Sequence, residues 1–365
     1  MAKDNQPTTE VTAKSETTLL NRSECNIMRG FAIILIIIDN FAHCFKGVLM
    51  DNEYAYRWSS VLGFLDNLKH PDQLLFFNTI SFYCPYGVML FIFLSGYCLT
   101  LKYEKGNGRG TSCKEFISNH YSKLFTMQLK GLALFLTVYF LCFPEKVAGY
   151  SIVLQTFLVG NLNPKQFCTP GPYWFFGMIM EMYVIYRLII YNRKDIVAIG
   201  LTVFSIVVMA FLDPEGKMMI YLRVNCFLAI LPFCMGVLAA RHLDYKSWNL
   251  NRGWICLGWF LLSFGLLTLS KFNFYSWLIM PVFIIATAVT VVKLITRVKL
   301  LVVAYSWLGA MSGVLFVVHP ALRELLKIRI NTTGTYYSMT IIYLLITFGL
   351  CMILKPAFSG KKKEK

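Results

Sequence analysis

Residues 27–45 read IMRGFAIILIIIDNFAHCF, and this stretch decides the class of the protein. The run is almost unbroken in its apolar character and is long enough to cross the ~30 Å hydrocarbon layer of a membrane as a helix. Similar apolar segments follow at residues 78–101, 124–143, 172–192, 195–213, 222–240, 253–270, 276–294, 300–319 and 336–355. We therefore predict an all-α polytopic membrane protein with about ten transmembrane helices.

The composition excludes several other classes of protein. Of the 365 residues, 57 % are hydrophobic and 15 % are charged, and the mean hydropathy is +0.57. Soluble proteins contain roughly 45–50 % apolar and about 25 % charged residues. The 11 cysteines include no Cys-x-x-Cys pair and lie mostly in apolar segments, so we expect neither a metal site nor a disulfide framework. A soluble enzyme, a disulfide-rich secreted protein and a disordered chain are excluded.

The positive charges predict the topology. The net charge is +16, and Lys and Arg collect in membrane proteins on the cytoplasmic side. The apolar segment 150–160 would be only about 16 Å long as a helix, so we expect it to be interfacial or re-entrant rather than crossing. With that choice, the segments on the side of the N-terminus hold about twice as many Lys and Arg residues as the opposite side. No basic nucleic-acid motif accompanies the charge, so we expect no nucleic-acid partner.

This topology divides the chain into three parts. Residues 1–24 are polar and predict a disordered cytoplasmic tail, and no cleavable signal peptide precedes the first apolar segment. Residues 25–356 form the membrane domain, and residues 357–365 form a basic cytoplasmic tail. We expect a multi-pass protein of the plasma (inner) membrane with both termini in the cytoplasm, in contact with membrane lipids.

The first apolar segment also carries the most informative polar residues. Asp39 and His43 are four positions apart, which places them on one face of a helix within hydrogen-bond reach. A carboxylate beside an imidazole can orient the ring so that it removes a proton from a hydroxyl group. The alternative is a mutually satisfied polar pair that holds this helix to a neighbour.

A second group of candidates is expected at the cytoplasmic surface. Arg29 lies at the inner end of the first helix, about 21 Å from His43. His120 and Lys123 are three positions apart at the start of the third helix, where cations and free backbone N–H groups can bind phosphate. The positive-inside distribution explains Lys123 equally well.

Further candidates are expected towards the outer face. Glu181 is a carboxylate inside an apolar segment, and His319 precedes a proline at the outer end of another. Ionisable residues within spanning helices commonly face a cavity or a partner, although His319 also fits a helix-end role. Tyr173 and Trp174 begin the helix of Glu181, where aromatic residues also mark the membrane interface.

Four segments together resemble a known family. They are RGFAIILIIIDNFAH at 29–43, FIFLSGYCL at 91–99, YWFFGMIMEMYVIY at 173–186 and SGVLFVVHP at 312–320. In this order and spacing they resemble acyltransferase family 3, a family of integral membrane O-acyltransferases, over about residues 24–355. No additional soluble domain follows, so the chain is similar to the single-domain form.

The resemblance implies an activity and two sites. Members of the family transfer an acyl group, usually acetyl, from acyl-CoA on the cytoplasmic side to a hydroxyl group of a sugar or lipid acceptor. A His in the first helix is expected to be essential, and an Arg-x-x-Arg pair at the start of the third helix is associated with the donor. We therefore expect Arg29, His120 and Lys123 to bind acyl-CoA, and Asn40, Tyr173, Trp174, Glu181 and His319 to line the acceptor cavity.

The chain departs from the family pattern at both sites. About eleven residues after Arg29, where the family has its His, this chain has Asp39 and Asn40, and His43 follows one turn later. His120 and Lys123 replace the Arg-x-x-Arg pair, and neither offers the bidentate fork of Arg. We consider two alternatives: His43 has become the base, oriented by Asp39, or the fold is kept with lost or changed chemistry.

The sequence therefore predicts an acyltransferase in which His43 and Asp39 are catalytic. Transfer can be direct or can pass through an acyl-His intermediate. A transporter or flippase of a small or lipid-linked solute would also keep buried Asp and His residues as proton relays. Transporters commonly show repeated halves with broken helices, and we find no such repeat in this sequence.

Overall fold

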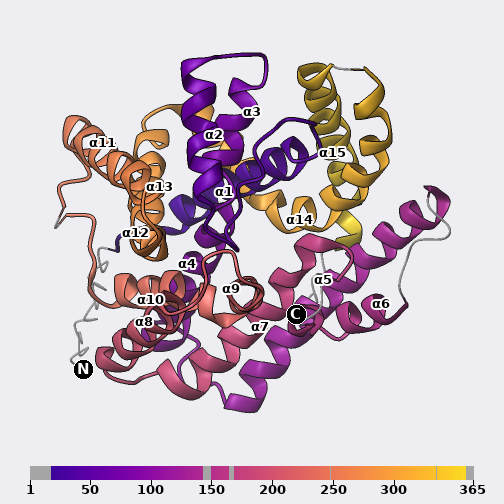
Figure 1. The fold of residues 1–365 in the computed structure, drawn as a ribbon. Helices are drawn as coiled ribbons and strands as arrows, with labels where there is room; N and C mark the ends of the chain where they lie inside the picture. The colour runs from indigo at the N-terminus through magenta and orange to yellow at the C-terminus, as the bar shows by residue number, and fades with distance from the viewer. Residues whose placement is uncertain (1–17, 143–148, 164–167, 247, 334, 359–365) are drawn as a thin grey trace, which may run out of the picture.

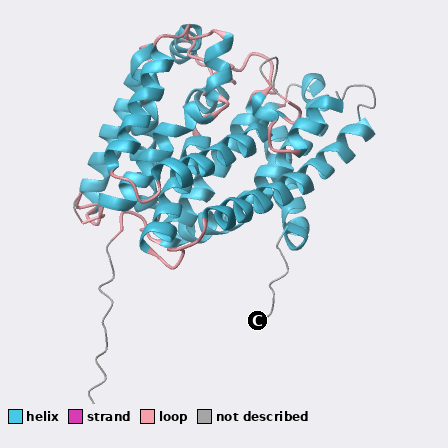
Figure 2. Ribbon diagram, turned by 90° about the horizontal axis from the view of Figure 1, so that it is seen from below, coloured by secondary structure: helices cyan, strands magenta, loops and turns pink. Residues whose placement is uncertain are grey.

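The structure is a computed structural model that describes residues 18–142, 149–163, 168–246, 248–333 and 335–358. Within these ranges every regular element is helical and no strand occurs, as Figure 2 shows. The predicted all-α class is confirmed. Most of the predicted N-terminal tail, residues 1–17, and most of the basic C-terminal tail, residues 359–365, lie outside the described residues.

The helices follow one another along the chain with short connections. The α-helices are α1 (Arg22–Ala42), α2 (Trp58–Lys69), α3 (Leu75–Tyr83), α4 (Gly87–Thr100), α5 (Cys113–Cys142), α6 (Gly149–Thr156), α7 (Trp174–Ile185), α8 (Asp195–Ala210), α9 (Lys217–Arg223), α10 (Cys226–His242), α11 (Gly253–Ser270), α12 (Phe274–Leu278), α13 (Met280–Ile295), α14 (Lys299–Thr333) and α15 (Tyr336–Phe358). Two π-helical segments, η1 (Leu101–Lys105) and η4 (Tyr186–Ile190), extend α4 and α7, and two short 3₁₀ turns, η2 (Gly160–Leu162) and η3 (Gly171–Tyr173), precede α7.

Each of the ten apolar segments contains a helix. Among the described residues, seven helical stretches are long and apolar enough to span a membrane, and α9 with α10 forms an eighth that is bent by 40°. The remaining two, α8 and α13, are apolar helices of 16 residues, shorter than the ~20 residues of an ordinary span. The protein is therefore a multi-pass membrane protein.

Local sequence sets the ends of α1, which carries the main candidate residues. The Asn21 side chain accepts a hydrogen bond from the backbone N–H of Glu24, and the Glu24 carboxylate accepts one from the backbone N–H of Asn21. This reciprocal arrangement is a capping box, which satisfies two of the N–H groups that a helix leaves free at its start. The helix ends at its C-cap residue, His43.

Two close helix pairs form the centre of the molecule. α1 packs most extensively on α14, and α4 packs most extensively on α10, while α1 and α4 also contact each other. Figure 1 shows α11 to α13 on one side of this centre and α15 on the other. At the α4–α10 contact, a Cβ added at Gly96 or at Gly236 would lie 2.2 Å from a carbonyl oxygen of the opposite helix. Small residues thus allow the backbones to approach closely, as in other membrane helix pairs.

Burial within the protein separates the central helices from the peripheral ones. The apolar stretch from α3 to η1 is 78 % buried, whereas those of α5, α11 and α15 are each only 22 % buried. The exposed side chains of these outer helices are mainly Leu, Ile, Val, Phe and Trp, so these helices face lipid.

Two short helices lie between the spans. α6 has eight residues and corresponds to the predicted interfacial or re-entrant segment, so the prediction of a short helix at this position is confirmed. The sequence did not predict α2, which lies in the connection between the first two spans. In the part of this connection that precedes α2, residues 50–54 line a cavity together with His43 at the end of α1.

Candidate functional site

A polar cavity of about 350 Å³ opens beside the end of α1. Its wall includes side chains from α1, from the 46–57 connection, from the start of α7 and from α14. Among the predicted residues, Asn40, His43 and Trp174 line it. The cavity therefore brings His43 together with Trp174 and Arg323, which follow it by about 130 and 280 positions in the chain.

A chain of hydrogen bonds fixes the ring of His43. Its Nε2 lies 2.8 Å from the hydroxyl oxygen of Ser81, and that hydroxyl donates its single proton to the carbonyl oxygen of Leu49. Ser81 can then only accept from His43, so the proton of the neutral imidazole is on Nε2. Within the described part of the chain no group bonds Nδ1, which carries the lone pair. This geometry leaves Nδ1 as the atom of His43 that could accept a proton.

Asp39 lies near His43 but does not hold it. The Asp39 Oδ1 is 3.7 Å from Nε2 of His43, beyond hydrogen-bond distance. Asp39 is 5 % exposed, and Oδ1 has no hydrogen-bond partner among the described residues. The two residues share a face of α1, but the group that orients the imidazole is Ser81, whose role the sequence did not indicate.

Buried cations hold the 46–57 connection over the cavity. Lys271, directly after α11, donates to the Asp51 carboxylate and to the carbonyl oxygen of Phe82. Arg223 of α9 donates to the carbonyl oxygen of Glu53. Burial raises the pKa of the Glu53 carboxyl to about 7, although hydrogen bonds and Arg223 oppose the shift. The roof of the cavity is therefore a network of buried charges.

An arginine from α14 reaches the position where the family pattern has its His. Arg323 Nη1 donates to Oδ1 of Asn40 at 3.0 Å, and its Nη2 donates to Glu324 at 2.8 Å. Both Arg323 and Glu324 line the cavity, as does Lys327. The Asn40 amide also donates to the carbonyl oxygen of Ile36 at 2.9 Å, so its orientation is fixed.

The other residues predicted for the outer cavity are divided between its wall and its surroundings. Trp174 lines the cavity, and its indole N–H donates to the hydroxyl of Tyr54 at 2.9 Å. Tyr173 is buried behind it and donates to the carbonyl oxygen of Val317 at 2.7 Å. His319 is fully buried in α14, with Nδ1 at 3.1 Å from the carbonyl oxygen of Leu315. Neither Tyr173 nor His319 is among the residues that line the cavity.

Glu181 caps a helix instead of lining the cavity. Its Oε2 accepts from the backbone N–H of Cys226, the first residue of α10, at 2.9 Å. Its Oε1 accepts from the side-chain amide of Asn161 at 2.5 Å. A carboxylate at this position satisfies a free N–H group and interacts favourably with the helix dipole. This geometry gives Glu181 a structural contact at the bend between α9 and α10.

The residues predicted to bind the acyl-CoA donor lie near the other end of α1. Arg29 Nη2 contacts Sγ of Cys98 at 3.8 Å. The imidazole of His120 lies 4.8 Å from the ring of Tyr183, with Nδ1 at 2.7 Å from the carbonyl oxygen of Phe116. His120 therefore packs against α7, while Lys123, one turn further along α5, is exposed.

The site residues that the sequence did not indicate have little local signal. Ser81 lies in an apolar segment and resembles any small residue of a membrane helix. Arg323 lies beyond the predicted apolar segment 300–319, although α14 continues through it. Asp51 and Glu53 belong to a polar connection whose fold depends on Lys271 and Arg223. Only the tertiary contacts reveal these roles.

The fold and the cavity define a class of protein: a polytopic membrane protein with a polar, histidine-lined cavity at one end of its central helix. Residues 22–355 match the acyltransferase domain of acyltransferase family 3, which is nearly the whole chain. The chain belongs to this family and is a membrane acyltransferase. No curated protein and no solved structure matches the chain significantly.

Proposed function

We propose that the protein transfers an acyl group, usually acetyl, from acyl-CoA to a hydroxyl group of a carbohydrate or lipid-linked acceptor of the cell envelope. The observation that carries this proposal is that His43, whose Nδ1 has no hydrogen-bond partner among the described residues, lines the polar cavity. The membership of an acyltransferase family supplies the reaction class. Polar and aromatic groups around the cavity, including Asn40 and Trp174, suit a hydroxylated acceptor.

The proposed reaction begins with the acceptor hydroxyl in the cavity. Nδ1 of His43 takes the hydroxyl proton as the oxygen attacks the carbonyl carbon of the thioester. The carbon–sulfur bond then breaks, and the CoA sulfur leaves as a thiolate that recovers the proton from the imidazolium. Ser81 holds the ring throughout, and Asp39 lies close enough to stabilise the positive imidazolium.

The donor is proposed to enter at the opposite end of α1. Arg29, His120 and Lys123 supply the groups that bind the phosphates of acyl-CoA, and the spacing between Arg29 and His43 is about 21 Å. The pantetheine arm therefore has to extend into the protein so that the thioester reaches the cavity. Lys123 is the exposed member, which suits the outermost phosphate contact.

We further propose that both termini are cytoplasmic, that the protein resides in the plasma (inner) membrane and that residues 25–356 form its catalytic domain. The excess of Lys and Arg in the segments on the side of the N-terminus supports this orientation. Arg29, His120 and Lys123 then face the cytoplasm, where acyl-CoA is made. His43 and the polar cavity face the opposite side.

The test of this proposal measures transfer from radiolabelled acetyl-CoA in membranes that contain or lack the protein. We expect label in a lipid or glycan fraction only when the protein is present, and competition by other acyl-CoAs defines the donor. Arg29→Ala should raise the KM for acetyl-CoA, whereas Arg22→Ala, at an exposed arginine seven residues earlier, should not. Equal KM values for the two variants would contradict the donor site, and absence of label with every acyl-CoA would contradict the reaction.

A further inference from the structure

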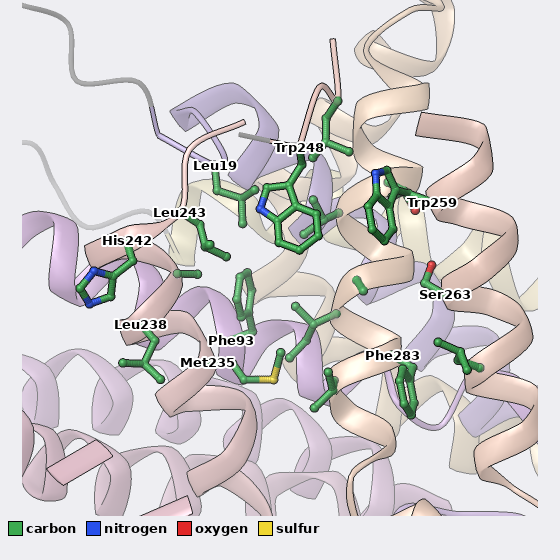
Figure 3. Close-up of a pocket in the computed structure, with 18 of the residues that line it drawn as sticks. Leu19, Phe93, Met235, Leu238, His242, Leu243, Trp248, Trp259, Ser263 and Phe283 are labelled. Carbon is green, nitrogen blue, oxygen red and sulfur yellow. The ribbon is translucent and has the colours of Figure 1, made fainter. Parts of the chain in front are cut away.

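A second, much more apolar cavity lies on the other side of α4. It has a volume of about 670 Å³ and forms a groove between α10 and the α11–α13 pair. Figure 3 shows Met235 and Leu238 on one wall, Trp259 and Phe283 on the other, and Phe93 of α4 between them. The groove lies away from the residues of the candidate active site and does not include His43.

The few polar side chains of the groove are already satisfied within the protein. Among its lining residues, His242 Nε2 is 2.7 Å from the Asp195 carboxylate. The hydroxyl of Ser263 donates to the carbonyl oxygen of Phe260, and that of Thr290 donates to the carbonyl oxygen of Thr287. The lining thus offers a polar ligand little beyond the indole N–H groups of Trp248 and Trp259, and water in the interior of the groove would find few partners. A hydrocarbon is the chemistry that fits.

The dimensions of the groove match one leaflet of a membrane. The lining residues of α13 extend from Val282 to Thr290, which is about 12 Å along the helix. Half of the hydrocarbon core is about 15 Å thick. Since both walls are helices of the membrane domain, an acyl chain can enter from the side without leaving the bilayer.

The polar end of the groove carries positive charge. Asp195 and His242 mark this end, and the two connections beside it, residues 191–194 and 243–252, contain the exposed cations Arg193, Lys194, Lys246 and Arg252. Trp248 and Trp259 lie there with their ring centroids 5.0 Å apart, a position typical of aromatic side chains at the membrane interface. Clustered cations beside a membrane span attract anionic lipid head groups.

We propose that this groove binds one anionic phospholipid. Its acyl chain would lie between α10 and α13, and its phosphate would face the cations at the polar end. Residues 1–17, which precede the groove residue Leu19, are too polar in sequence to fill an apolar groove. The lipid would complete the packing between the α4–α10 pair and the α11–α13 pair.

The experiment is native mass spectrometry of the purified full-length protein after incubation with equal amounts of phosphatidylglycerol and phosphatidylcholine. We expect one retained phosphatidylglycerol. Ala286 is exposed on the groove wall, so Ala286→Phe should reduce retention about tenfold, since an added ring occupies the space of the chain. The matched control is Ala304→Phe at an exposed alanine of α14 outside the groove, which should retain the lipid.

A second variant tests the head-group contact without changing the groove. Arg193→Gln with Lys194→Gln should lower phosphatidylglycerol retention, whereas Lys217→Gln, an exposed lysine of α9, should leave it unchanged. Equal retention of phosphatidylcholine would overturn the anionic assignment. Equal retention by Ala286→Phe and Ala304→Phe, or loss of a protein dimer instead of a lipid in Ala286→Phe, would overturn the lipid site.

Discussion

Ser81→Ala tests the hydrogen-bond chain that orients His43, the proposed base. The substitution removes the acceptor 2.8 Å from Nε2 of His43 and leaves a partly buried N–H donor without its partner. Such a loss costs about 1–3 kcal/mol, which corresponds to a decrease of about 5- to 150-fold in kcat/KM. The decrease should appear mainly in kcat, because Ser81 acts on the base and is not among the residues that line the cavity.

The assay is acyl transfer by the purified, reconstituted enzyme, measured as a function of pH. Ser81→Thr keeps the hydroxyl and should recover most of the rate. Ser205→Ala is the control, because Ser205 is also fully buried but bonds only the carbonyl oxygen of Thr202 in its own helix. A ¹⁵N spectrum of the imidazole groups, with His43 assigned by substitution, should show a proton on Nε2 in the intact protein.

Two results would refute this reasoning. The first is a decrease in kcat/KM for Ser81→Ala that is no larger than the decrease for Ser205→Ala. The second is a proton on Nδ1 of His43 in the intact protein, since this tautomer would place the lone pair on Nε2, towards Ser81, and leave none on Nδ1.

Three predictions concern stability. Gly96→Ala should lower the free energy of unfolding by about 1–3 kcal/mol relative to Gly258→Ala, because the new Cβ meets a carbonyl oxygen at 2.2 Å, whereas at Gly258 no atom lies within 4 Å. Burial raises the pKa of the Glu53 carboxyl in the folded state from 4.5 to about 7. Between these two pH values the unfolded chain loses the proton and the folded protein keeps it, so the free energy of unfolding falls as the pH rises. Glu53→Gln should therefore remove about 3 kcal/mol of that pH dependence, measured as melting temperature against pH. Lys271→Met leaves Asp51 without its buried partner and should cost about 3–5 kcal/mol, while adding Asp51→Asn should recover most of the loss.

Each of these stability predictions has a contradicting result. Equal melting temperatures for the two glycine variants would mean that the α4–α10 contact accommodates the added methyl group without a loss of stability. Parallel pH curves for the intact protein and Glu53→Gln would mean that the Glu53 carboxyl ionises normally. A double variant no more stable than Lys271→Met would mean that the lysine acts through a contact other than Asp51.

The sequence predicts the membrane architecture well because a spanning helix is specified locally. An apolar run of about 20 residues has to satisfy its backbone groups internally, and a helix does so without help from distant residues. The same local rule identified segment 150–160 as too short to cross. It could not identify the break between α9 and α10, because the capping contact of Glu181 with Cys226 joins residues 45 positions apart.

The candidate active site is harder to predict from the sequence, because its contacts also join residues that are far apart in the chain. The spacing of Asp39 and His43 correctly places both on one face of α1, but their distance of 3.7 Å leaves the orientation of the ring to another group. That group, Ser81, comes from α3, and Arg323 reaches Asn40 from a helix 283 positions away. Contacts of this kind depend on how helices pack, which a single sequence does not specify.

The most direct test of the central claim compares His43→Ala with His70→Ala in acyl transfer from radiolabelled acetyl-CoA at matched expression. His70 is a largely exposed histidine, with 78 % of its side-chain surface accessible. We predict that His43→Ala lowers transfer by about 10²- to 10⁴-fold, the usual contribution of a general base, and that His70→Ala leaves it unchanged. Transfer that persists in His43→Ala at the level of His70→Ala would contradict the role of His43 as the base.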